Sequence, residues 1–175
     1  MNPKNGPINV GLLGLGVVEN GIVKALAQKR ALIAQHIGRP IHITRILVRD
    51  LDKARSIEVS PGLLTADPTD ILEDPQVHLV VEVMGGERPA LDYLRQALQQ
   101  GKSVVTANKE VMAKHGPELL ALATANGVQI LFEASVGGGI PILRPLTKDL
   151  GANEIGAIRA IINGTTNYML TRMAQ

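Results

Sequence analysis

Two glycines near the start of the chain have the spacing of a phosphate-binding turn. The apolar run INVGLL at residues 8–13 predicts a buried strand, and Gly14 and Gly16 follow it directly. In such a turn the first glycine makes the tight bend and the second lets the backbone approach a pyrophosphate. The helix that follows offers free N–H groups and the positive end of its dipole. We therefore expect a dinucleotide site formed by Gly14, Gly16, Val17 and Val18; the alternative is a plain turn between a strand and a helix.

Glu19 departs from this pattern. A third glycine is usual at its position, where it allows the helix to pack closely on the strand. A glutamate adds bulk there and brings a negative charge near the phosphates. Gly21, two residues further on, is expected to relieve crowding between helix and sheet. The turn is therefore expected to bind its cofactor with modest affinity.

The charges after the second expected strand bear on which cofactor is bound. An acidic side chain at this place usually binds the adenosine ribose hydroxyls and favours NAD. An arginine suits the 2′-phosphate of NADP, through its charge and its bidentate geometry. Arg49 is the first residue after the strand, and Asp50 follows it. We expect NADP, bound through Arg49, with NAD still possible; the alternative is a solvated charged loop.

Strands and helices must alternate along the chain to position these residues, and the sequence has that order. The expected strands are residues 8–13, 41–48, 77–84, 103–107 and 128–134. The expected helices lie between Gly16 and Gly38, from Pro89 to Gly101, from Pro117 to Asn126, and around Ile142 to Leu150, where Pro145 predicts an irregularity. This order predicts an α/β fold: a Rossmann-like, doubly wound, mostly parallel sheet with helices on both faces. We assign it to residues 1–150.

Residues 151–175 break the alternation. A strand-like run at 154–162 leads into an expected helix that Thr165 or Thr166 caps, and Gln175 falls in the middle of that helix. We expect the chain to be part of a longer protein and residues 151–175 to begin a second domain. Residues 154–175 are then expected to self-associate or to stay disordered.

Composition removes several classes of function. Of the 175 residues, 45% are hydrophobic, which predicts a globular protein with a real core. Aromatic residues are 2% and the formal charge is +2, so nucleic acid is not an expected partner. There is no cysteine, which excludes thiolate chemistry and disulfides. No apolar run is long enough to cross a membrane, and the start lacks the apolar core of a signal peptide. We expect a cytoplasmic protein without a membrane partner.

Three later stretches make the chain similar to a known family. VVTANKEVMAKHG at residues 104–116, FEASVGGGIPI at 132–142 and INGTTNYML at 162–170 resemble, in order and spacing, motifs of homoserine dehydrogenase. The opening glycine turn resembles the same family, so the likeness covers nearly the whole chain. It implies an NAD(P)-dependent oxidoreductase that interconverts homoserine and aspartate semialdehyde in threonine and methionine biosynthesis. It also implies a homodimer with a cofactor domain joined to a substrate and dimerisation domain.

The resemblance assigns further residues to the site. It places Thr106 and Lys109 beside the nicotinamide end of the cofactor. It likens FEASVGGGI to a monovalent-cation site, usually for sodium, with oxygen ligands from the Glu133 carboxylate and from the backbone carbonyls of Val136, Gly138 and Ile140. The residues alone leave a plain glycine turn before a helix as the alternative. The family's substrate-binding acids and its lysine proton donor lie beyond the last motif, past Gln175. The isolated chain is therefore expected to be inactive.

Two other functions are compatible with these residues. One is a stand-alone nucleotide-binding or regulatory module that kept the fold and lost the chemistry, which Glu19 favours. The other is the cofactor domain of a different NAD(P)-dependent dehydrogenase. The intact TANKE and FEASVGGGIPI motifs favour homoserine dehydrogenase.

Overall fold

The computed structural model describes residues 6–55, 59–161 and 163–174, apart from the side chains of Val17, Glu19, Pro61 and Thr165. The chain divides into two compact units, Met1–Phe132 and Glu133–Gln175. The second unit thus begins at Glu133, whereas the sequence predicted a division after residue 150.

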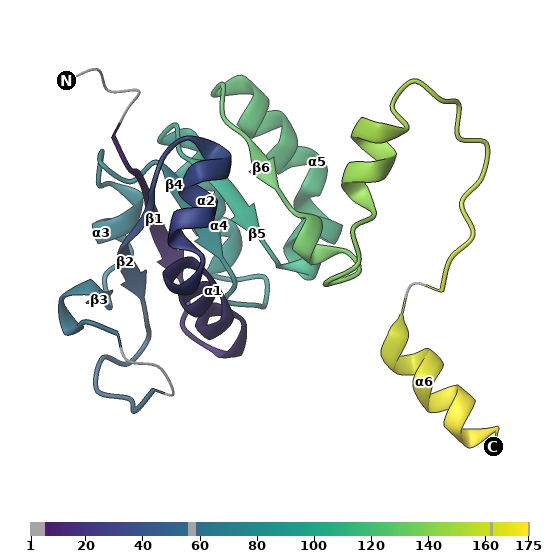
Figure 1. Cartoon of the computed structure of the whole chain (residues 1–175), viewed down its shortest axis with the longest axis horizontal. Coiled ribbons are helices and arrows are strands. Elements are labelled where there is room, and N and C mark those ends of the chain that lie inside the picture. The colour runs from purple at the N-terminus through teal and green to yellow at the C-terminus, as the bar shows by residue number, and fades with distance from the viewer. Residues whose placement is uncertain (1–5, 56–58, 162, 175) are drawn as a thin grey trace. The chain divides into compact units, whose positions relative to one another are not determined.

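The first unit is built on a six-stranded sheet in which neighbouring strands are parallel (Figure 1). The strands are β1 (Ile8–Leu13), β2 (Ile41–Leu47), β3 (Leu64–Thr65), β4 (Leu79–Glu82), β5 (Ser103–Thr106) and β6 (Ile130–Leu131). Their order across the sheet is β3-β2-β1-β4-β5-β6. This is the order of dinucleotide-binding doubly wound sheets, so the predicted fold class is confirmed.

Helices make the connections between these parallel strands. The helices of the first unit are α1 (Val17–Gln28), α2 (Arg30–Ile37), α3 (Thr69–Leu72), α4 (Ala90–Gln99) and α5 (Lys109–Ala125), and a 3-10 turn, η2, covers Pro61–Leu63. The first and third of the expected helices differ from those observed. The helix expected between Gly16 and Gly38 is broken at Lys29, which ends α1 and begins α2. Pro117 was expected to begin a helix but lies inside α5, because Asn108 caps that helix at an earlier residue.

The core lies on both faces of the sheet. Successive side chains of a strand point to opposite faces, so Leu12 and Leu13 of β1 enter different clusters of buried residues. The cluster around Leu12 includes Ile22 and Val23 of α1. The larger cluster around Leu13 is completed by side chains of α3, α4 and α5, among them Leu94. Helices therefore cover both faces, as the sequence predicted.

The described part of the second unit contains three short helical elements: a 3-10 turn, η3 (Glu133–Ser135), a π-helical turn, η4 (Pro145–Asp149), and the helix α6 (Gly164–Met173). The irregularity expected at Pro145 is confirmed, since the Leu150 N–H donates to the Pro145 carbonyl at 2.9 Å. The cap of α6 is Asn163 rather than a threonine: its side-chain oxygen accepts the Thr166 N–H at 2.8 Å.

The strand expected at residues 154–162 is not formed in the part the structure describes. Residues 154–161 have no regular secondary structure, and position 162 lies outside the described residues. Ile155, Ile158 and Ile161 are 45%, 62% and 76% exposed. An extended apolar run becomes a strand only when another strand satisfies its backbone. The prediction that this segment associates or is disordered stays a prediction.

Two glycines of the first unit have opposite surroundings. Gly11 lies in β1, and a β-carbon added there would stand 2.3 Å from the Ile71 Cγ2 of α3. This close approach lets α3 pack directly on the central strand. Gly21 in α1 is exposed, and a β-carbon there would meet nothing within 4 Å. The expectation that Gly21 relieves crowding against the sheet is therefore wrong.

Replacing Gly11 with alanine is expected to lower the free energy of unfolding by about 1–3 kcal/mol, the usual effect of overpacking a filled core. Gly21→Ala is the matched control. It should raise the free energy of unfolding by up to about 1 kcal/mol, because alanine is the better helix former. Urea unfolding of the two variants and the unaltered chain measures both effects. Equal stability of Gly11→Ala and the unaltered chain would show that Ile71 moves aside without cost.

Candidate functional site

The site predicted from the sequence lies where the connections of the sheet diverge. From β1 the chain passes through α1 and α2 to β2 on one side; from β4 it passes through α4 to β5 on the other. Because β1 and β4 are neighbours, these connections leave the carboxyl edge in opposite directions. Open α/β sheets bind ligands in the crevice at such a switch point. Gly14 and Gly16 follow β1 and therefore lie at this point.

The glycine turn has the backbone geometry of a phosphate site. Gly14 has a φ of +110°, which other residues rarely adopt, and its N–H donates to the Leu47 carbonyl at 3.0 Å. This bond ties the turn to the end of β2. Gly16 is the N-cap of α1 and provides no side-chain hydrogen bond to the first N–H groups of the helix. Those groups are suited to an anion. Val18 is 57% exposed beside them.

The side chains of Val17 and Glu19 lie outside the described part of the chain. The expected contribution of Val17 to the cofactor site, and the expected effect of Glu19 on phosphate binding, therefore stay predictions.

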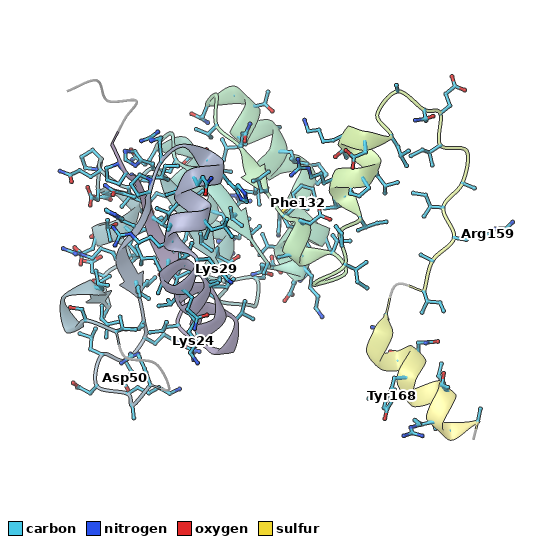
Figure 2. All side chains as sticks on the ribbon, viewed as in Figure 1. Lys24, Lys29, Asp50, Phe132, Arg159 and Tyr168 are labelled. Atoms are coloured by element: carbon cyan, nitrogen blue, oxygen red, sulfur yellow. The ribbon has the colours of Figure 1, made fainter. Side chains whose placement is uncertain are left out.

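Arg49 and Asp50, the two candidates for binding the adenosine ribose, differ in what their charged groups contact in the loop after β2. Asp50 lies in this loop (Figure 2). Its carboxylate accepts the N–H groups of Asp52 at 2.9 Å and Lys53 at 3.2 Å, so it closes its own turn. Arg55 donates to backbone carbonyls of the same loop. Arg49 is exposed and makes no hydrogen bond or ion pair with the residues that the structure describes. Of the two candidates, Arg49 is the one whose charged group is not already bound by the loop.

A buried carboxylate lies at the carboxyl end of β4. Glu82 is the last residue of this strand and is 0% exposed. It pairs in register with Leu13 of β1 and Thr106 of β5. Its carboxylate accepts the Thr106 hydroxyl at 2.5 Å and the Met84 N–H at 2.8 Å. Thr106, which the sequence placed beside the nicotinamide, is itself fully buried and holds this carboxylate.

Asn108 connects this carboxylate to the start of α5. Its N–H donates to the Thr106 hydroxyl oxygen at 3.0 Å, and its side-chain amide donates to the Gly86 carbonyl at 2.7 Å. Its side-chain oxygen accepts the Val111 N–H at 3.1 Å and so caps the helix. Lys109, the first residue of α5, is exposed at the same edge. Asn108 thus fixes the position from which Lys109 projects.

Glu82 and Asn108 were not among the site residues predicted from the sequence. Asn108 was open to prediction, because an asparagine just before a helix is a preferred N-cap. Glu82 stands in the otherwise mostly apolar run VHLVVEVM, and a carboxylate inside a predicted buried strand marks an unusual site.

A second carboxylate, Glu87, holds the segment after the Gly85–Gly86 turn, in which both glycines have a φ of +73°. Glu87 accepts the Lys114 ammonium at 2.6 Å and pairs with the His115 Nε2 at 3.0 Å, both on α5. These two bonds, the one from Lys114 foremost, lower the pKa of Glu87 to about 2. The connection from β4 to α4 is therefore held against α5 over the ordinary pH range.

In the second unit Glu133 caps a helix start. Its Oε1 accepts the N–H groups of Ile142 at 2.6 Å and Leu143 at 2.9 Å, and its Oε2 accepts the Arg144 N–H at 2.9 Å. These bonds, the Ile142 one first, lower its pKa. Left-handed backbone at Gly137 and Gly138, with φ of +76° and +60°, bends the intervening segment.

The predicted cation ligands lie within this one capped loop: Glu133, Val136, Gly138 and Ile140. Among the hydrogen bonds of the described residues, none is accepted by the backbone carbonyls of the last three. These three oxygens are therefore compatible with a cation, whose site would share the Glu133 carboxylate with the helix start.

Three features of the described residues bear on other sites. No cluster of three or more His, Cys, Asp or Glu side chains could hold a metal ion there. No helix in the described part is both long and apolar enough to span a membrane. A shallow hollow lined by Arg30, His42 and Arg45 lies along the first residues of β2, away from the glycine turn.

Comparison with known proteins agrees with this arrangement. Residues 14–133 match the family model of the NAD-binding domain of homoserine dehydrogenase, and residues 141–175 match the homoserine dehydrogenase family model. The chain belongs to the homoserine dehydrogenase family. The resemblance predicted from the three motifs is thus confirmed, and the NAD-binding match spans the glycine turn, Arg49, Thr106 and Lys109.

Individual homoserine dehydrogenases are similar over nearly all of the chain. The Bacillus subtilis protein is 47% identical over 166 residues, which are 95% of this chain and 38% of that protein. A crystal structure from Thiobacillus denitrificans is 46% identical with a TM-score of 0.90, over 97% of this chain and 39% of that one. A hyperthermophilic archaeal homoserine dehydrogenase in complex with NADPH is 26% identical with a TM-score of 0.76, over 95% and 56%. The chain spans about 38% of the length of the Bacillus relative.

Proposed function

We propose that this chain provides the cofactor-binding unit of a homoserine dehydrogenase, which interconverts homoserine and aspartate semialdehyde by hydride transfer with NADP. The observation that carries the proposal is the Gly14–Gly16 turn at the switch point of a six-stranded parallel sheet, in a chain of this family. The NADPH complex of the archaeal relative supports the class of cofactor. A cytoplasmic homodimer acting in threonine and methionine biosynthesis belongs to the same proposal.

Each part of the cofactor has residues suited to it. The pyrophosphate is assigned to the turn and to the free N–H groups at the start of α1, with Val17 and Val18 beside it. The 2′-phosphate is assigned to Arg49. The nicotinamide end is assigned to the edge formed by Thr106 and Lys109. The bound cofactor supplies or accepts the hydride; these residues bind and orient it.

The proposal includes a monovalent cation, sodium, at the Glu133 loop. Hard cations prefer carboxylate and carbonyl oxygens, and the loop offers both. Each carboxylate oxygen can accept two bonds, and Oε2 accepts one hydrogen bond within the described residues. Glu133 can thus cap the helix and ligate the cation together, and its negative charge offsets the positive end of the helix dipole.

An exchange of cofactor units tests the proposed reaction. Residues 1–132 of this chain replace the corresponding unit of the Bacillus subtilis homoserine dehydrogenase. The chimera is expected to oxidise homoserine with NADP, measured by absorbance at 340 nm. Gly16→Val is the control, because a side chain at this N-cap is expected to block the phosphate. A folded chimera that binds NADPH without oxidising homoserine would favour a nucleotide-binding module without catalysis.

Calorimetric titration of the chain tests the cofactor preference. NADPH should bind a few-fold more tightly than NADH, because an exposed charge-assisted bond contributes less than the roughly 1.5–3 kcal/mol of a sheltered one. Arg49→Ala should remove this preference and leave NADH affinity unchanged. Lys53→Ala, which removes a cation from the same loop, should have the smaller effect. Equal losses of affinity for NADPH and NADH in Arg49→Ala would assign Arg49 a structural role.

Thermal unfolding in matched salts tests the cation. At one ionic strength, the midpoint is expected to be higher in sodium chloride than in N-methylglucamine chloride, because a ligand that binds only the folded state stabilises it. Glu133→Gln should abolish the difference, whereas Glu154→Gln, an exposed carboxylate of the same unit, should keep it. Identical midpoints of the unaltered chain in the two salts would leave Glu133 as a helix cap alone.

A further inference from the structure

Glu82 is a buried carboxylate to which the proposed function assigns no role. Its side chain is fully buried, and it forms no ion pair with the residues that the structure describes. Burying a carboxylate without a counter-charge is costly, and a neutral side chain of the same size would fill the space more cheaply. The position therefore has a property that packing alone does not require.

The hydrogen bonds around Glu82 all point toward its oxygens. The Met84 N–H donates to Oε1, and the Asn108 amide makes a longer contact of 3.4 Å with the same atom. The Thr106 hydroxyl donates to Oε2 at 2.5 Å, and its oxygen accepts the Asn108 N–H at 3.0 Å. Glu82 is an acceptor at both oxygens, as an ionised carboxylate is. Its negative charge is thereby held in place by neutral donors.

The position of this charge in the sheet relates it to the cofactor. The register places Glu82 between Leu13, the last residue before the glycine turn, and Thr106, the last residue of β5. The crevice assigned to the cofactor lies over these strand ends. The nicotinamide ring carries a positive charge when oxidised and none when reduced. A fixed negative charge under a site of low dielectric constant discriminates between those two states.

We propose that Glu82 sets the relative affinity of this site for the two redox forms of its cofactor, so that NADP⁺ is bound more tightly than NADPH. The inference rests on the proposed function, since it requires the cofactor to bind at the switch point. A carboxylate at this position shifts the equilibrium between the bound redox forms toward the oxidised cofactor. It therefore favours reduction of the aldehyde, the direction that produces NADP⁺.

A purely structural role would have a different signature. If Glu82 only held Asn108 and the Gly85–Gly86 turn in place, its loss would weaken both redox forms alike. A charge effect acts on the cationic ring and leaves the neutral ring unaffected. The ratio of the two affinities, rather than either value, therefore separates the two roles.

The experiment measures dissociation constants of NADP⁺ and NADPH by calorimetry for the unaltered chain, Glu82→Gln and Asn108→Ala. Glu82→Gln keeps the shape and removes the charge, and it should shift the affinity ratio toward NADPH by about five-fold. Asn108→Ala disrupts the same network and keeps the charge, so it should weaken both forms and preserve the ratio. Thermal unfolding establishes that each variant is folded.

Three outcomes would overturn the inference. An unchanged ratio in folded Glu82→Gln would do so while leaving the proposed function standing. If that variant does not fold, the unaltered chain decides alone: NADPH binding as tightly as NADP⁺ contradicts the inference. Failure of the unaltered chain to bind either form would overturn the proposed function and the inference with it.

Discussion

Parallel strand pairing is the constraint on which the rest of the first unit depends. A parallel sheet sends each connection from the carboxyl edge of one strand back to the amino edge of the next, so the strand ends gather at one edge. The order β3-β2-β1-β4-β5-β6 makes the connections diverge between β1 and β4. The glycine turn, the loop with Arg49 and the start of α5 lie along this one edge, because each follows a strand of the sheet.

The same arrangement explains why polar groups are buried at this edge. Glu82 and Thr106 occupy the last positions of adjacent strands, where pairing brings their side chains together inside the sheet. Burial makes their hydrogen bond strong and makes an unpaired oxygen costly, so the network is fully connected through Asn108. Stability and function are coupled here, because the bonds that satisfy the buried carboxylate also orient the helix start beneath the proposed nicotinamide site.

The second unit is organised by local hydrogen bonds rather than by a sheet. Glu133 binds three backbone N–H groups nine to eleven positions further along the chain, and Asn163 caps α6 in the same manner. Between these caps, Ile155, Ile158 and Ile161 are exposed along a segment without regular structure. These caps reach at most eleven positions along the chain, whereas an apolar extended segment needs a surface that such local contacts do not supply.

Local chemistry let the sequence alone determine most of the fold and part of the site. Apolar runs bounded by glycines marked five of the six strands, left-handed Gly38 and Gly101 ended helices, and Gly14 and Gly16 marked the turn. These features depend on near neighbours, so they can be read from a short stretch of residues. Only the tertiary structure decided what depends on distant ones: the break at Lys29, the two-residue strand β3, the absence of a strand at residues 154–161, and the contact of Gly11 with Ile71. Glu82 belongs to the same group, because its partners Thr106 and Asn108 are more than twenty residues away and meet it only when β4 and β5 pair.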